Sequence, residues 1–272
     1  MLGIWLLMMT INSVTLVNYP LALPNIAKEF GIPPPSTFIY YLGVLTYSLG
    51  LFVIYFGNFN GWMNTRVRLA VILAQVFLII PLFLIPFTFS YNAIVVLRFI
   101  QGLWFMELGL ATLNLRGWFS KGELAIAMAA PPLSALQFGS ALGGFIEKAI
   151  AEQIGWRMAF LITGVMDVVA TAIFLVLYRD APGYNDYLVI NRLRNLAERG
   201  KHGCPPPYKL PIAYAIGFAQ IATTMAFASI PYLVPTYGYW LGYSVPAVSN
   251  TVLIYGIISG LGIWVVPYSV QY

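Results

Sequence analysis

Charged residues are scarce in this sequence. Only 8% of the 272 side chains are Asp, Glu, Lys or Arg, whereas 60% are hydrophobic. A soluble domain has roughly a quarter of its residues charged, so a water-soluble fold is excluded. Each bilayer crossing needs about 20 apolar residues, and the mean hydropathy of +0.80 agrees with several crossings. The composition therefore predicts a polytopic integral membrane protein in contact with the lipid bilayer.

Cysteine and histidine are almost absent as well. Cys204 is the only cysteine and His202 the only histidine. A single cysteine forms neither an internal disulfide nor a thiolate cluster, and a single histidine without further ligands is a poor metal site. The sequence also has no phosphate-binding loop, paired-histidine motif or nucleophile elbow. We therefore expect no metal, no cofactor and no enzymatic activity. The alternative, a membrane-embedded enzyme such as an acyltransferase, would need a His or Asp pair at the membrane surface, and the sequence shows no such pair.

Basic residues are in excess, with 14 Lys and Arg against 9 Asp and Glu. They are scattered in short clusters between apolar runs, which is typical of topology signals and not of a nucleic-acid-binding surface. If the first loop is outside, ten basic residues fall in inner loops and three in outer loops, and Arg98 lies within a helix. The positive-inside rule then places both termini in the cytoplasm. We expect the cell membrane as the location and no nucleic-acid partner.

Apolar windows long enough to cross a bilayer define the fold class. They lack the period-two alternation of barrel strands, and only helices or closed barrels satisfy their backbone groups in lipid. We therefore predict an all-α bundle of about eight transmembrane helices. The windows lie at about 3–27, 37–57, 68–89, 91–114, 125–148, 157–178, 211–236 and 245–268.

One long connection divides the chain. Residues 179–210 form a polar, basic loop, while the other connections are short. The loop separates a first six-helix half, 1–178, from a partial second half of two helices, 211–272. Apolar residues recur at roughly helical spacing within the loop, which favours a short amphipathic helix on the membrane surface. A solvated linker without fixed structure is the alternative.

Three ionisable residues fall inside predicted helices: Arg98 and Glu107 in the fourth, and Asp167 in the sixth. A charge at mid-bilayer costs at least ~2.5–3.5 kcal/mol, so each is a candidate for substrate binding or ion coupling. The structural alternative is pairing or snorkelling to an interface. Arg98 and Glu107 are nine positions apart, about 180° around a continuous helix, so they do not pair within it. Arg98 instead shares with Gln101 a small, polar face that is suited to lining a cavity, so Gln101 is a candidate substrate-binding or coupling residue as well.

Uncharged amides within the helices supply further candidates. Single Ser and Thr residues usually bond to their own helix backbone, whereas Asn and Gln are rarer in such helices. We select Asn18 in the first helix, Gln137 in the fifth and Gln220 in the seventh as candidate substrate-binding or coupling residues.

Glycines mark two helices for close packing. In the fifth helix, Gly139 and Gly143 stand in a GxxxG relation, followed by Gly144. The eighth helix repeats the spacing with Gly256 and Gly260. Small residues at this spacing let another helix approach closely, so we expect them to serve helix packing.

Several ordered motifs resemble those of the major facilitator superfamily of secondary transporters. Arg98–Gly102 resembles its R-x-x-Q-G element in the fourth helix, and Trp118–Ala127 its W-F-x(3)-E-x(3)-A pattern in the loop that follows. Ala135–Gly144 is similar to the fifth-helix G-x-x-x-G-P-x-x-G-G motif, and Gly155–Gly164 to G-W-R-x-x-F-x-x-x-G at the start of the sixth helix. Their order and spacing carry the resemblance.

The chain also departs from the family pattern. In the loop between the second and third helices, Gly61 replaces the family's acidic residue and Trp62 a basic one. Ser140 stands where the fifth-helix motif usually has proline, which weakens an antiporter interpretation. The family has twelve helices in two halves, whereas this chain ends within or just after its eighth. The resemblance therefore implies a truncated transporter that lacks four helices.

The resemblance implies a transporter that moves a small organic solute by alternating access, coupled to an ion gradient. It places Arg98 at a central cavity, where it holds an anionic substrate or biases the proton affinity of a nearby carboxylate, for which Asp167 is the candidate. The solute is an anionic metabolite or a hydrophobic compound, and the coupling ion a proton or another cation. A non-transporting receptor or assembly protein of the same fold, or an inactive fragment, is the alternative.

Overall fold

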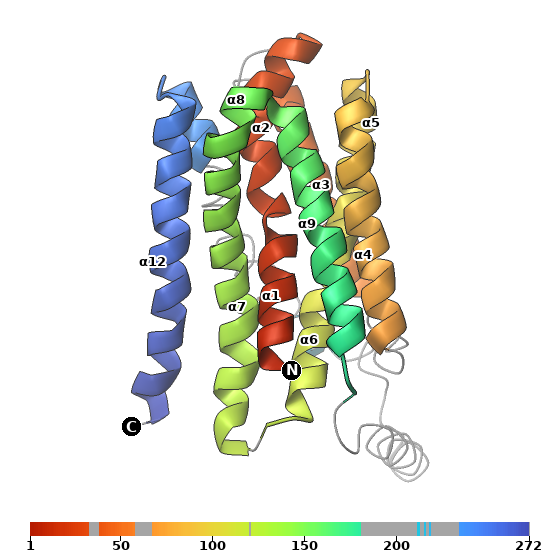
Figure 1. Ribbon diagram of the computed structural model, residues 1–272, viewed down its shortest axis with the longest axis vertical. Helices are drawn as coiled ribbons and strands as arrows, with labels where there is room; N and C mark the ends of the chain where they lie inside the picture. Colours follow the sequence, from red (N-terminus) through yellow and green to blue (C-terminus); the bar gives the residue numbers. More distant parts are fainter. Residues whose placement is uncertain are drawn as a thin grey trace.

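In the computed structural model, the protein is a bundle of long helices that run side by side (Figure 1). The structure describes residues 1–32, 38–57, 67–119, 121–180 and 234–271, with positions 211, 212, 215 and 218. All regular structure in these residues is helical. Five described stretches are long and apolar enough to cross a membrane. The predicted polytopic all-α bundle is therefore confirmed.

The helices follow the predicted apolar windows to within a few residues. Most of the predicted seventh helix at 211–236, and the loop at 179–210 beyond Asp180, lie outside the described residues. The elements are α1 (Leu2–Ser13), α2 (Thr15–Phe30), α3 (Phe38–Gly57), α4 (Val67–Leu84), η3 (Ile85–Phe87), α5 (Tyr91–Gly102), η4 (Leu103–Phe105), α6 (Met106–Arg116), α7 (Lys121–Ile146), η5 (Glu147–Ala151), α8 (Glu152–Ile154), α9 (Trp156–Leu177) and α12 (Val245–Gln271).

Two crossings predicted as continuous helices are interrupted. The first is broken at Val14, between α1 and α2. The side chains of Ser13 and Thr15 bond to backbone carbonyls of the preceding turn, an arrangement that commonly bends helices. The fourth crossing contains the 3₁₀ turn η4 between Arg98 and Glu107. A 3₁₀-helix has fewer residues per turn than an α-helix, so each residue rotates further around the helix axis. The angle between the Arg98 and Glu107 side chains therefore differs from the angle predicted for a continuous α-helix.

Two glycines set sharp turns at one end of the bundle. Gly31 ends α2 with a φ of 63°, and Gly155 precedes α9 with a φ of 101°. Side chains with a Cβ rarely adopt such backbone conformations, which is why glycine stands at both positions. The turns bring the end of α2 beside the start of α9, where Trp156 donates a hydrogen bond to Glu29.

Helix α7 lies between α1 and α12 and contacts both closely (Figure 1). A Cβ added at Gly139 would lie 2.5 Å from the Thr10 carbonyl oxygen of α1. On the α12 side, a Cβ at Gly144 would lie 2.9 Å from the Ser249 carbonyl oxygen, and one at Gly256 would lie 2.5 Å from a carbonyl oxygen of α7. The glycines therefore allow backbone-to-backbone approach on two faces of α7.

Candidate functional site

Arg98 is fully buried in the fourth crossing. Its Nη1 donates hydrogen bonds to the Thr15 carbonyl oxygen, at 3.4 Å, and to Oε1 of Gln101, one turn away on the same helix. The guanidinium carbon lies 4.8 Å from the centre of the Tyr19 ring and 4.1 Å from that of Tyr47. Both distances suit a cation–π contact. The two tyrosines form an aromatic cage around the guanidinium, built from α2, α3 and α5.

Neighbouring side chains hold the aromatic cage in place. Nε1 of the buried Trp104 donates a hydrogen bond of 2.5 Å to the Tyr47 hydroxyl. The Tyr19 hydroxyl donates to that of Tyr91 at 3.3 Å. The Tyr19 ring lies directly against Gly43, where any Cβ would overlap it. The cage is therefore positioned by contacts from the second and fourth crossings in addition to Arg98.

Glu107 is the centre of a second buried polar cluster. Its Oε2 accepts hydrogen bonds from the Asn12 amide at 2.8 Å and from the Gln75 amide at 2.7 Å. Oε1 of Gln75 in turn accepts a bond of 2.9 Å from the Thr171 hydroxyl. The four residues come from α6, α1, α4 and α9. The cluster therefore ties four helices together around one carboxyl group.

Asp167 lies on α9, one turn before Thr171, and its side chain is fully buried. Among the described residues, neither of its carboxyl oxygens has a hydrogen-bond partner. Thr171, one turn further along the same face of α9, donates to Gln75, whose amide donates to Glu107. Asp167 therefore lies on the face of α9 that carries the Glu107 cluster, and no hydrogen bond links it to Arg98.

The other predicted site residues lie apart from these two clusters. The Asn18 amide donates to the Thr163 hydroxyl at 2.8 Å, joining α2 to α9. Oε1 of Gln137 accepts a bond of 2.8 Å from Ser259, joining α7 to α12. Gln220 lies outside the described residues.

Sequence reasoning missed some residues that build the site. Gln75 is an amide in an apolar window, and the rarity argument that selected Gln137 applies to it equally. Tyr19 and Tyr47 carried no comparable signal, because the chain contains 18 tyrosines and many sit near membrane interfaces. Only the packing of three helices shows that these two enclose Arg98.

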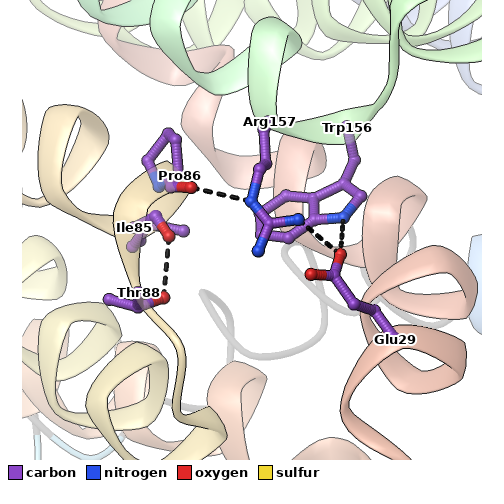
Figure 2. Close-up of polar contacts among 6 residues, drawn as sticks. All are labelled: Glu29, Ile85, Pro86, Thr88, Trp156 and Arg157. Carbon is purple, nitrogen blue, oxygen red and sulfur yellow. Dashed lines mark hydrogen bonds and ion pairs between the residues drawn. The ribbon is translucent and has the colours of Figure 1, made fainter.

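A third set of polar contacts lies at one end of the bundle, and Figure 2 shows it. Oε2 of Glu29 accepts from Nη1 of Arg157 at 2.5 Å and from Nε1 of Trp156 at 3.0 Å. Nε of Arg157 donates to the Pro86 carbonyl oxygen at 2.7 Å. We call these four residues the end clasp, which joins α2, η3 and α9. Its Trp156 and Arg157 belong to the G-W-R motif, whose local role it explains.

A polytopic helical bundle with polar clusters buried inside its crossings is typical of membrane proteins that handle small solutes or ions. A family model, Major Facilitator Superfamily, matches residues 4–271, and the chain belongs to that family. This confirms the resemblance of the motifs. The family is one of transporters and not of enzymes.

One solved structure extends the comparison. The fold is similar to that in the crystal structure of a D-xylose-proton symporter, with a TM-score of 0.61 and 15% sequence identity. The match covers 93% of this chain and 65% of that chain. This chain thus spans less than two thirds of the symporter's length, and the likeness concerns the fold. No curated protein matches the sequence.

Proposed function

We propose that this chain works as a secondary transporter that moves a small organic solute by alternating access, driven by an ion gradient. Family membership supports transport, and the structurally similar protein is a proton symporter. The observation that carries the proposal is Arg98, a fully buried cation inside a crossing. Inserting such a residue at mid-bilayer costs at least ~2.5–3.5 kcal/mol. A functional role explains this cost better than helix packing does.

Arg98 and the aromatic cage suit an anionic organic solute. The guanidinium lies against a backbone carbonyl, an amide and the rings of Tyr19 and Tyr47. A carboxylate or phosphate group adds charge-assisted hydrogen bonds in the fork geometry of arginine. The rings of Tyr19 and Tyr47 offer stacking surface to the apolar part of the same solute. When the solute binds, its anionic group takes the place of a tyrosine ring on one face of the guanidinium.

The proposal also includes how the two halves move and on which side of the membrane the chain ends lie. The two halves, 1–178 and 211–272, move relative to each other around the solute. Helix α12 contacts the first half through α7, at the glycines that allow close approach. Both chain ends lie at the same end of the bundle (Figure 1), which supports placing them together in the cytoplasm. The cell membrane is the proposed location.

Uptake into proteoliposomes tests this function. The full chain is reconstituted, an ion gradient is imposed, and accumulation of labelled organic anions and of neutral analogues is measured. We expect anions to accumulate and the Arg98→Ala variant to lose accumulation while remaining inserted. Val176→Ala is the matched control, because Val176 is 81% exposed on the bundle surface. Full transport by Arg98→Ala contradicts the role of Arg98.

Solute binding separates transport from the alternatives. A bound solute at 100 times its Kd stabilises the folded protein by ~2.7 kcal/mol, which raises its melting temperature in detergent. A transporter shows this stabilisation together with accumulation. A receptor of the same fold shows stabilisation without accumulation, and an inactive fragment shows neither.

A further inference from the structure

The amide group of Gln101 lies beside Arg98 and is bonded on its oxygen side. Gln101 is fully buried, and its Oε1 accepts a hydrogen bond from Nη1 of Arg98. Arginine carries only donors, so this bond fixes which way the amide is turned. The donor side, Nε2 with its two N–H groups, has no hydrogen-bond partner among the described residues. Because a buried donor without a partner costs free energy, Nε2 is a place where an acceptor group binds favourably.

The backbone is interrupted on both sides of this place. Helix α5 ends at Gly102, directly after Gln101, and the 3₁₀ turn η4 follows. The first crossing is broken at Val14, and the carbonyl oxygen of the next residue, Thr15, accepts from Arg98. Irregular backbone at membrane depth is tolerated where it is enclosed by protein or lines a cavity. Binding sites in transporters commonly lie at such discontinuous helices, so the two breaks indicate a ligand site here independently of the Nε2 donor.

Arg98 and Gln101 together determine which solute fits. The guanidinium and the amide share a hydrogen bond, so both lie close enough to contact neighbouring atoms of one small molecule. The guanidinium suits a carboxylate. The amide N–H groups suit a neutral acceptor beside that carboxylate, such as a hydroxyl or carbonyl oxygen on the adjacent carbon. An ammonium group on the same carbon carries only donors and a positive charge, so it is repelled by Arg98 and leaves the amide unpaired.

We propose that Gln101, through Nε2, selects carboxylates that carry an oxygen on the carbon next to the carboxyl group, which are 2-hydroxy and 2-oxo acids. The carboxylate binds Arg98, and the oxygen on the adjacent carbon accepts a hydrogen bond from the Gln101 amide. An unsubstituted acid leaves this donor without a partner, and a 2-amino acid places a cation against it. This selectivity rests on the proposed function, since it concerns the solute of the same site.

Binding of three-carbon acids by the purified full chain in detergent tests this selectivity. The probes are 2-hydroxypropanoate, 2-oxopropanoate, propanoate and 2-aminopropanoate, and the shift of melting temperature with concentration gives each Kd. We expect the first two to bind at least about tenfold more tightly than propanoate, because only they pair the buried donor. We expect 2-aminopropanoate to bind more weakly than propanoate. Equal affinities for 2-hydroxypropanoate and propanoate, or no saturable binding of any of the four acids, overturn the proposal.

Two variants test whether the preference comes from Gln101. Gln101→Met removes the amide from an unbranched side chain, so 2-hydroxypropanoate and propanoate should bind equally. Gln101→Glu keeps an oxygen for Arg98 and replaces the donors with an acceptor, so 2-aminopropanoate should bind more tightly than 2-hydroxypropanoate. Gln153→Met is the matched control, because Gln153 is exposed on the short helix α8, and it should keep the native ranking. A residue that only held Arg98 in place would affect all four acids alike, so an unchanged ranking in either Gln101 variant overturns the proposal.

Proteoliposome uptake separates this proposal from the proposed function. Accumulation of organic anions without a preference for the 2-hydroxy and 2-oxo acids contradicts the role of Gln101 and leaves transport unaffected. The preference in binding without any accumulation contradicts transport and leaves the role of Gln101 unaffected. Circular dichroism verifies the helical content of each variant.

Discussion

The end clasp makes a sharp prediction, because one oxygen of Glu29 accepts two hydrogen bonds of different kinds. The bond from Arg157 is an ion pair whose side chains are 34% and 38% exposed, and such pairs contribute ~0.2–1 kcal/mol. The bond from Trp156 satisfies an indole N–H on a residue that is 5% exposed. Leaving such a donor without a partner costs ~1–3 kcal/mol. Glu29→Gln removes the charge and keeps an acceptor oxygen, whereas Glu29→Ala removes both.

We therefore expect Glu29→Gln to lower the stability by less than ~1 kcal/mol and Glu29→Ala by ~1–3 kcal/mol more. Thermal unfolding in detergent, followed by tryptophan fluorescence and circular dichroism, measures the difference. Salt provides the internal control: at about 1 M salt the cost of Glu29→Gln shrinks, because an exposed ion pair is screened. The further cost of Glu29→Ala does not shrink. Equal melting temperatures for the two variants would refute the assignment of the larger part to Trp156.

Three further predictions concern the bundle and the aromatic cage. Gly256→Ala should lower the melting temperature, since its Cβ would lie 2.5 Å from a carbonyl oxygen of α7, whereas Gly262→Ala on the same helix enters open space and should be neutral or stabilising; similar effects of both would contradict the packing of α12 on α7. Tyr47→Phe should cost ~1–3 kcal/mol, because it leaves the buried indole N–H of Trp104 without its acceptor, and chemical denaturation that gave no loss would argue against this bond. Arg98→Lys should reduce anion uptake at least about tenfold with normal insertion, because lysine keeps the charge but not the planar fork; native rates in the proteoliposome assay would exclude recognition by the guanidinium.

The positions of the crossings were predictable, since a bilayer imposes one requirement on every stretch that spans it. A window such as 157–178 has to be apolar and helical whatever its neighbours are, and α9 coincides with it to within a residue at each end. The breaks at Val14 and at η4 were not predictable in the same way. They depend on side-chain bonds and packing at single turns, which change the average hydropathy of a window very little.

The residues of the candidate site were likewise predictable in part: the ionisable residues were, and their partners were not. Arg98, Glu107 and Asp167 stand out in the sequence by themselves, because an ionisable group in an apolar window is costly wherever the helix packs. Their partners are a matter of rotation and contact between helices. Only the tertiary structure brings amides from other crossings to Glu107 and encloses Arg98 between Tyr19 and Tyr47. The hydropathy of a segment depends on that segment alone, so the sequence determines it. Which buried side chains contact each other depends on how several helices are rotated and packed, so only the tertiary structure determines it.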